Sequence, residues 1–210
     1  MASPTWIDHL VLAAPTLDDG VSFVAAALGV APTPGGSHPG RGTHNALASL
    51  GAPTYLEVIA PDPAQAGSGS LPFGLDAGVS EPRLVAFAVG CADIDRTVAD
   101  LRARGFTDID APSAMSRVLP NGSELSWRLT MVGASPMGPT PFLISWDGGT
   151  SPAFDSPLAG RLVALRAGHP TPSGPLELLA ALGVDVQVEP SPTPWLEATI
   201  ETDGGLAQLR

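Results

Sequence analysis

Apolar residues recur along the chain in three copies of one pattern, each a short apolar run followed by an amphipathic helix. The runs HLVLAA, LVAFAV and LVALRAG have the length of buried strands. In the segment after the first run, apolar side chains at helical spacing form one stripe: Leu17, Val21, Val24, Ala25 and Leu28. The helices are expected to end at three glycines about 76 and 78 residues apart, Gly29, Gly105 and Gly183.

The starts of these helices carry their own signals. Thr16 is the expected N-cap of the first helix, and Asp19 lies three residues on, where a capping partner is favoured. Asp93 is the expected cap of the second helix. Pro175 suits the first position of the third helix, because that position needs no backbone N–H.

Further strand-like runs follow each helix: NALASLG and TYLEVIA, then LSWRLTMVG and PFLISW, then VDVQVEP and LEATIETDGGLAQL. The pair Gly204-Gly205 predicts a tight hairpin. A strand–helix repeat can also indicate a parallel α/β sheet. One helix to three or more strands per unit instead favours an α+β fold with the helices on one face.

Segments rich in Gly, Pro and Ser divide the chain. We predict a first βαβββ module at 1–62, a linker at 63–82, a second βαβββ module at 83–148 and a partial third module at 158–210. The partial module leaves an apolar edge or face to cover. It is expected to pack on the first two modules or to pair with its counterpart in a second chain, and we favour a homodimer.

Charge and composition exclude several functions. The net charge of −11 opposes binding to nucleic acid or to an anionic membrane surface. All ten basic residues are arginine, which excludes Schiff-base and P-loop lysine chemistry, and we expect no nucleotide cofactor. Cys91 is the one cysteine, and the N-terminal apolar run of about six residues is too short for a signal peptide. We expect a cytoplasmic protein.

The opening segment IDHLVLAAPTLDDGVSFVAAALGV and the segment GTHNALASLGAPTYLEVIAPDP resemble the vicinal-oxygen-chelate superfamily, and within it the glyoxalase-like domain proteins. The resemblance covers roughly residues 6–62, with PFLISW as an echo in the second module. It implies a half-open barrel of two βαβββ modules with helices outside and a divalent metal and substrate inside. Members of the superfamily include lactoylglutathione lyases, extradiol dioxygenases, epimerases, bleomycin-resistance proteins and binders without catalysis.

Strand alternation predicts which side chains face this cup. If Leu10 and Leu12 face the helix layer, His9 faces the cup; by the same argument, so do Tyr55 and Glu57 of TYLEVIA. His9 and Glu57 occupy positions where the resemblance implies metal ligands. If Leu47 packs beneath the helix, His44 also faces the cup. His9, His44 and Glu57 would then suit Zn²⁺, Fe²⁺, Ni²⁺ or Mn²⁺.

The second module is expected to contribute an arginine and aromatic side chains. Aligning the strands at Gly51 and Gly133 sets Arg128 opposite Ala46, facing the cup, where a guanidinium would bind a substrate carboxylate. The candidate substrate-binding residues are Arg128, His44, Asn45, Tyr55, Trp127 and Trp146. The resemblance implies ligands from the second module too, but those positions carry Val85 and Ile144. A standard lactoylglutathione lyase is therefore excluded.

Two kinds of function remain open. The first is a metal-assisted lyase, isomerase or dioxygenase-like enzyme in which Glu57 abstracts a proton next to a carbonyl. The second is a non-catalytic binder of a small molecule or drug, favoured by the apolar positions Val85 and Ile144. In a structural alternative, Glu57 and His9 form an ion pair that only stabilises the sheet.

Overall fold

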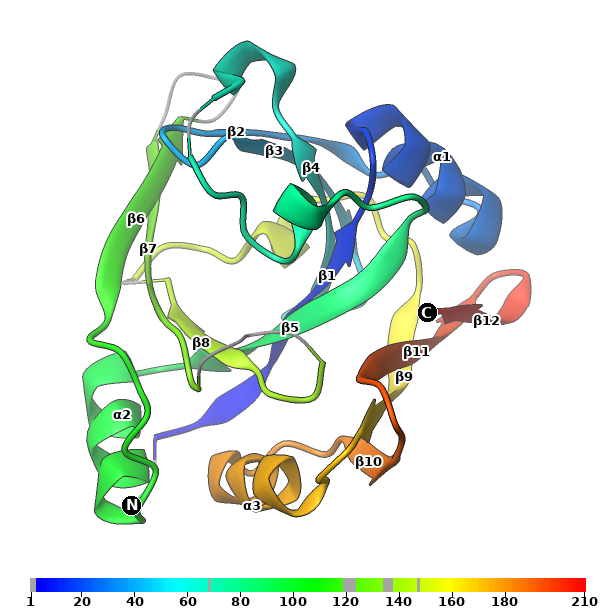
Figure 1. Cartoon of the computed structure of the whole chain (residues 1–210). Coiled ribbons are helices and arrows are strands. Elements are labelled where there is room, and N and C mark those ends of the chain that lie inside the picture. The colour runs from blue at the N-terminus through cyan, green and yellow to red at the C-terminus, as the bar shows by residue number, and fades with distance from the viewer. Residues whose placement is uncertain (1–2, 68, 119–123, 134–137, 147) are drawn as a thin grey trace.

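Two modules with the same order of elements form one curved eight-stranded sheet (Figure 1). The computed structural model describes residues 3–67, 69–118, 124–133, 138–146 and 148–210. The first module consists of β1 (Thr5–Ala13), α1 (Leu17–Leu28), β2 (Thr33–His38), β3 (Thr43–Ser49) and β4 (Tyr55–Pro61). The second consists of β5 (Arg83–Cys91), α2 (Ile94–Ala103), β6 (Ser113–Val118), β7 (Glu124–Thr130) and β8 (Phe142–Ser145).

The sheet has the strand order β2-β3-β4-β1-β5-β8-β7-β6. The first strands of the two modules pair antiparallel at its centre, and each pairs on its other side, in parallel, with the last strand of its own module. The sheet curls until its edge strands β2 and β6 come into contact. This nearly closed barrel, with helices outside, confirms the predicted α+β architecture.

Local signals position the helices as expected. The Thr16 hydroxyl accepts a hydrogen bond from the Asp19 backbone N–H at 3.1 Å, and Gly29 ends α1 with φ of 78°. Asp93 caps α2 through the Arg96 N–H. The third helix, α3 (Ser173–Leu182), begins two residues before the predicted start, so Pro175 is its third residue rather than its first.

The two faces of the sheet carry separate apolar clusters. Leu10, Leu12, Leu56 and Val58 face outward and pack with Val24 of α1 in the main core. The inward cluster includes Val11, Ala13, Ile59, Val85 and Ile144. Each strand therefore buries alternate residues on opposite faces, as its period of two requires.

The C-terminal unit forms a second sheet on the outer face of the first. It contains β9 (Arg161–His169), α3, β10 (Gln187–Pro190), β11 (Trp195–Thr202) and β12 (Gly205–Leu209), in the strand order β10-β9-β11-β12. Its first strand pairs with β10 and β11 rather than with its last strand, unlike in the two modules. The hairpin between β11 and β12 turns at Gly204-Gly205, as predicted.

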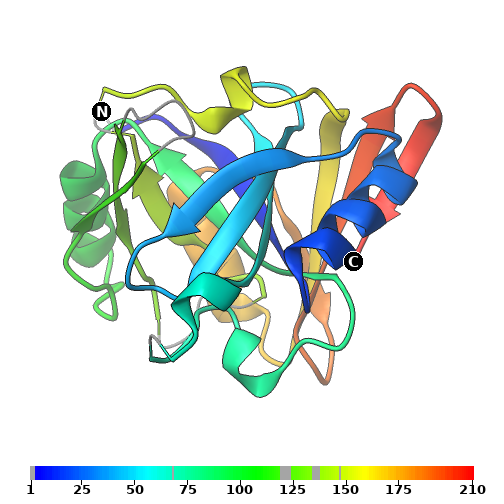
Figure 2. The same ribbon diagram turned by 90° about the horizontal axis from the view of Figure 1, so that it is seen from above.

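This unit (yellow to red in Figures 1 and 2) lies outside the curved sheet, beside α1. β11 contacts β5, β12 contacts α1, and Leu179, Leu196 and Ile200 share the main core with Phe87. Of the two expected ways to cover the third unit, packing on the first two modules is therefore realised within the chain. A homodimer stays a prediction.

The two edge strands of the sheet, β2 and β6, were not among the predicted strand-like runs. β2 has the sequence TPGGSH, and such a sequence reads as a turn. Pro34 is compatible with an edge strand because its missing N–H is needed by no outer neighbour. His38 ends this strand, with only 13% of its side chain exposed.

Candidate functional site

The inner face of the barrel encloses a mostly apolar cavity of about 130 Å³. His9, His38, Asn45 and Glu57 line it from the first module. The wall from the second module is apolar and aromatic except for one cation, and includes Trp127, Phe142, Ile144, Trp146 and Arg117. An engineered cavity of about 150 Å³ holds a benzene molecule, so this space suits a group of about six heavy atoms.

His9 and Glu57 face this cavity together, as strand alternation predicted. β1 and β4 pair in parallel with His9 opposite Tyr55, so Glu57, two residues on from Tyr55, projects from the same face. His9 Nε2 and Glu57 Oε2 are 3.7 Å apart, beyond hydrogen-bond length. The two atoms therefore converge on the cavity without being bonded to each other.

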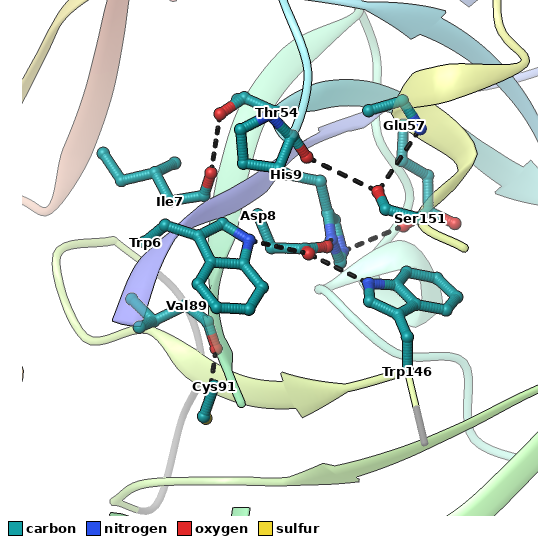
Figure 3. Close-up of polar contacts among 12 residues, drawn as sticks. Trp6, Ile7, Asp8, His9, Thr54, Glu57, Val89, Cys91, Trp146 and Ser151 are labelled. Carbon is teal, nitrogen blue, oxygen red and sulfur yellow. Dashed lines mark hydrogen bonds and ion pairs between the residues drawn. The ribbon is translucent and has the colours of Figure 1, made fainter. Parts of the chain in front are cut away.

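A bulge in β1 brings Asp8 behind His9. The pairing of β1 with β5 passes from Ile7 to His9, so Asp8 is the extra residue of the bulge and turns inward. Its carboxylate lies 2.8 Å from His9 Nδ1 and accepts hydrogen bonds from the indole N–H groups of Trp146, at 2.9 Å, and Trp6, at 3.3 Å (Figure 3).

The Asp8 carboxylate fixes the orientation of the His9 ring. A carboxylate only accepts hydrogen bonds, so Nδ1 of His9 carries the proton that joins the two residues. Nε2 is then the ring atom turned toward Glu57 and the cavity (Figure 3). Such a carboxylate–histidine pair sets the tautomer and direction of a histidine that acts at its other nitrogen.

Asn45 holds the other oxygen of Glu57. Its amide N–H donates to Glu57 Oε1 at 2.6 Å, and its carbonyl oxygen accepts from Arg117 Nη1 at 2.9 Å. The carboxylate can only accept and the guanidinium can only donate, so both contacts agree on the orientation of the amide. The result is a buried chain from Arg117 through Asn45 to Glu57.

His38 completes the polar wall. Its Nε2 is 3.2 Å from Asn45 Nδ2 and 3.8 Å from Glu57 Oε1, and its Nδ1 is 2.9 Å from Thr43 Oγ1. The amide is a donor, so Nε2 accepts and Nδ1 donates to the hydroxyl. Burial lowers the pKa of His38 despite the opposing effect of Glu57, in keeping with this neutral ring.

Aromatic rings hold His9 in place. Tyr55 stacks on it with ring centroids 4.6 Å apart, and Phe142 meets it edge-on at 5.3 Å. Burial, followed by the nearby Asp8 and Glu57 charges, raises the pKa of Tyr55 well above its ordinary value. On the opposite wall, the rings of Trp127 and Trp146 pack together with their centroids 5.9 Å apart. Asn45, Tyr55, Trp127 and Trp146 thus line the cavity in which substrate contact was predicted.

The predicted positions of His44 and Arg128 are wrong. His44 points away from the cup and borders a separate hollow near Asp62, because Ala46 and Ala48 pack against the helix layer while Leu47 contacts Tyr55 on the inner side. The expected phase of β3 was therefore inverted. Arg128 also lies on the outer side, where it forms two hydrogen bonds with Asp95 of α2, at 2.7 and 2.8 Å.

The residues present do not fit a metal centre with three protein ligands. The predicted set of His9, His44 and Glu57 cannot form because His44 lies outside the cavity. No group of three or more His, Cys, Asp or Glu side chains within the described ranges is arranged to hold a metal ion. His38 Nε2, the nearest substitute, accepts from Asn45, and the second module presents Val85 and Ile144, which are not ligands.

Three functional candidates were missed from the sequence: Asp8, His38 and Arg117. Asp8 is out of phase with His9 and turns inward only because of the bulge. The other two lie on the edge strands that the sequence pattern did not indicate. These two side chains come close to the predicted cup residues only when the barrel closes. No local sequence pattern therefore indicated that they belong to the site.

A comparison of sequences assigns the family. The model of the glyoxalase-like domain family matches residues 7–183, most of the chain. The chain belongs to the glyoxalase-like domain family. Its barrel is that of the vicinal-oxygen-chelate superfamily, as the opening segments suggested. Among curated proteins, no sequence matches it.

Several solved structures are similar to this chain. A hypothetical protein from Staphylococcus aureus matches with a TM-score of 0.73 at 13% identity, over 99% of both chains. The methylmalonyl-CoA epimerase from Mycobacterium tuberculosis has a TM-score of 0.44 at 18% identity, over 66% of this chain and 86% of its own. A variant of the Streptomyces coelicolor epimerase, in complex with 2-nitronate-propionyl-CoA, has a TM-score of 0.44 at 20% identity, over 69% and 97%. At 13% identity, the likeness to the Staphylococcus aureus protein shows the fold alone.

The helices give no sign of a membrane span. Within the described ranges, none is long and apolar enough to cross a bilayer.

Proposed function

We propose that this glyoxalase-like protein is an enzyme that moves a proton on a small carbonyl compound, with Glu57 as the base and His9 as a second proton-transfer group. The reaction class is that of an isomerase or lyase acting at the carbon next to a carbonyl. One observation carries the proposal. Glu57 Oε2 and His9 Nε2 converge on one small cavity, while the other polar atom of each side chain is held by Asn45 or Asp8.

The arrangement supports a definite order of events. Glu57 takes the proton from the carbon next to the carbonyl, and the electron pair of the broken C–H bond forms the double bond of an enolate. The carbonyl oxygen takes the negative charge. Glu57 then returns that proton to carbon or to the enolate oxygen, directly or by way of His9 Nε2, which carries a lone pair in this tautomer and accepts the proton before passing it on. A histidine suits this second role because its imidazole exchanges protons near neutral pH.

The enclosure of the site supports the same reading. Glu57 is only 8% exposed and His9 only 3%, so a bound substrate is surrounded by few water molecules. Electrostatic interactions that stabilise a developing charge are stronger in such a setting than in bulk water.

A second candidate is a binder without catalysis. The observation in its favour is the wall from the second module, which offers mainly apolar and aromatic contacts such as Trp127, Phe142 and Trp146. A site of this composition can hold a small apolar ligand without acting on it.

Solvent exchange separates the two candidates. The protein is incubated in D₂O with small carbonyl compounds, and the loss of the proton signal next to the carbonyl is followed by NMR. The native chain is expected to accelerate exchange, and Glu57→Gln to slow it by at least about 100-fold, since general-base catalysis contributes that much. Gln keeps the acceptor for Asn45, so the fold should be preserved.

Glu201→Gln provides the control, because Glu201 is an exposed carboxylate paired with Arg161 on the second sheet. It should leave the exchange rate unchanged. If compounds bind the native chain but their protons exchange no faster than in buffer, the result would instead support binding without catalysis.

A further inference from the structure

Arg117 is a buried cation with spare donors. It is 5% exposed and lines the cavity, yet its one hydrogen bond to a described residue runs from Nη1 to Asn45 Oδ1. No carboxylate of the described residues lies within ion-pair distance of it. A guanidinium carries five N–H donors, so donors beyond the one that Asn45 accepts are left for a ligand in the cavity that Arg117 lines. A buried charge left in this state is costly unless a ligand pairs with it.

The surrounding backbone is shaped for this guanidinium. Arg117 reaches from the edge strand β6 toward β2, where Gly35 faces it. A Cβ at position 35 would overlap both Arg117 Nη1 and Asn45 Oδ1. The absence of a side chain at Gly35 therefore makes room for the contact between Arg117 and Asn45.

A second arginine stands at the mouth of the same cavity. Arg41 is exposed, lines the cavity and contacts Met115 Sδ on β6 at 3.3 Å. Two of the ten arginines of a chain with net charge −11 thus border one small hollow. Glu57 is the carboxylate among the described lining residues, so the two arginines give this lining more positive than negative charge, which would attract a small anion.

We propose that Arg117 is the binding site for a carboxylate of the substrate, so that the substrate class is a small carbonyl acid. Arg41 guides the anion at the mouth. This inference rests on the proposed function, because it identifies the molecule on which Glu57 acts. A carboxylate matches the planar guanidinium, and the cavity of about 130 Å³ suits an acid of about six heavy atoms.

The geometry also relates the anion site to the proton-transfer site. Arg117 and Glu57 bind opposite ends of the same amide of Asn45. A carboxylate on Arg117 would therefore hold the adjacent carbonyl and its neighbouring carbon beside Glu57 Oε2. The guanidinium would also offset the negative charge that grows when the proton leaves.

Two isosteric probes test the charge directly. Pyruvate and butane-2,3-dione have the same number of heavy atoms and both carry a methyl group next to a carbonyl, but only pyruvate is an anion. Binding is measured by NMR titration, with the indole N–H signals of Trp127 and Trp146 as reporters in the cavity. The native chain is expected to bind pyruvate at least about tenfold more tightly than butane-2,3-dione, equivalent to about 1.4 kcal/mol.

Arginine variants assign the preference to a residue. Arg117→Met should remove the tenfold preference, and Arg117→Lys should keep part of it. Arg41→Met should weaken pyruvate binding less, because its charge is screened by solvent. Arg128→Met is the matched control: that arginine pairs with Asp95 on the outer side, so the preference should stay intact. Inorganic phosphate is the third probe and should bind more weakly than pyruvate.

The outcomes distinguish this inference from the proposed function. Equal binding of the two isosteres, no binding of pyruvate, tighter binding of phosphate, or an unchanged preference in Arg117→Met would each overturn the carboxylate site. None of these results depends on Glu57. Conversely, a lost preference in Arg117→Met together with unchanged exchange in Glu57→Gln would retain the anion site and overturn the proton-transfer role.

Discussion

The two modules share one order of elements but present opposite chemistry to the cavity between them. The first contributes His9, His38, Asn45 and Glu57, and the second contributes an apolar wall and Arg117. Positions equivalent by repeat to the two central polar residues, Val85 and Ile144, belong to the inward apolar cluster. The two modules therefore share one barrel architecture, while most of the polar lining groups lie on one side.

This difference has a physical basis in the partners that each wall provides. Glu57 is tolerated in a buried strand because Asn45 donates to it at 2.6 Å, and Asn45 in turn is held by Arg117. Ile144, by contrast, packs in a cluster of apolar and aromatic side chains. Substitutions in the two walls should therefore have very different consequences.

A carboxylate introduced into the apolar wall of the second module should destabilise the fold far more than Glu57 does in the first module. Ile144→Glu puts an unpaired charge among apolar residues, and we expect it to lower the free energy of unfolding by about 3–5 kcal/mol at neutral pH. Ile144→Leu keeps the volume and should cost less than about 1.5 kcal/mol. Urea unfolding of both variants measures the difference, and equal stabilities would show that the apolar wall accommodates charge.

Removal of the carboxylate behind His9 should slow the reaction while His9 and Glu57 stay in the cavity. In Asp8→Asn the amide can donate to Nδ1 of His9, which favours the tautomer with its proton on Nε2. We expect proton exchange next to the carbonyl of the substrate to slow by about 100-fold. The pH profile of the rate should change as well, which a loss of folded protein alone would not produce. Trp6→Phe removes a longer hydrogen bond to the same carboxylate, and its rate should remain close to that of the native chain.

The contact that joins the two walls depends on a missing side chain. Gly35→Ala should displace Arg117 or Asn45 and cost about 1–3 kcal/mol of stability, as overpacking does, together with weaker pyruvate binding. Gly174→Ala, where an added Cβ meets nothing within 4 Å, is the control for the effect of alanine itself. Full pyruvate affinity in Gly35→Ala would show that Arg117 does not need this approach.

The smallest effect concerns His38, whose pKa is lowered by burial. The folded chain prefers the neutral ring, so the unfolded chain binds a proton more readily once the pH falls below about 6.5, the ordinary histidine value. Stability should therefore decrease from pH 7.5 toward pH 5, and His38→Gln should flatten that decrease. Thermal unfolding across this range measures it, with His169→Gln on β9 as the comparison. An unchanged slope in His38→Gln would contradict the role of this ring.

The repeat, the helix ends and the direction of the central cup residues follow from local patterns in the sequence. Thr16, Gly29 and Gly183 act locally, so their effects could be predicted without knowing the fold. His9 and Glu57 were predicted to face inward because leucines and valines mark the opposite face of β1 and β4.

The remaining half of the site depends on contacts between residues far apart in the chain. Strand alternation predicted the wrong inward-facing residues in β3, because both faces of this strand are buried and Ala46 and Leu47 are compatible with either face. Asp8 turns inward through a bulge that depends on pairing with β5, a strand more than seventy residues away. Arg117 meets Asn45 only when the edges of two modules close around the cavity, and no local pattern of apolar and polar residues reports such a long-range contact.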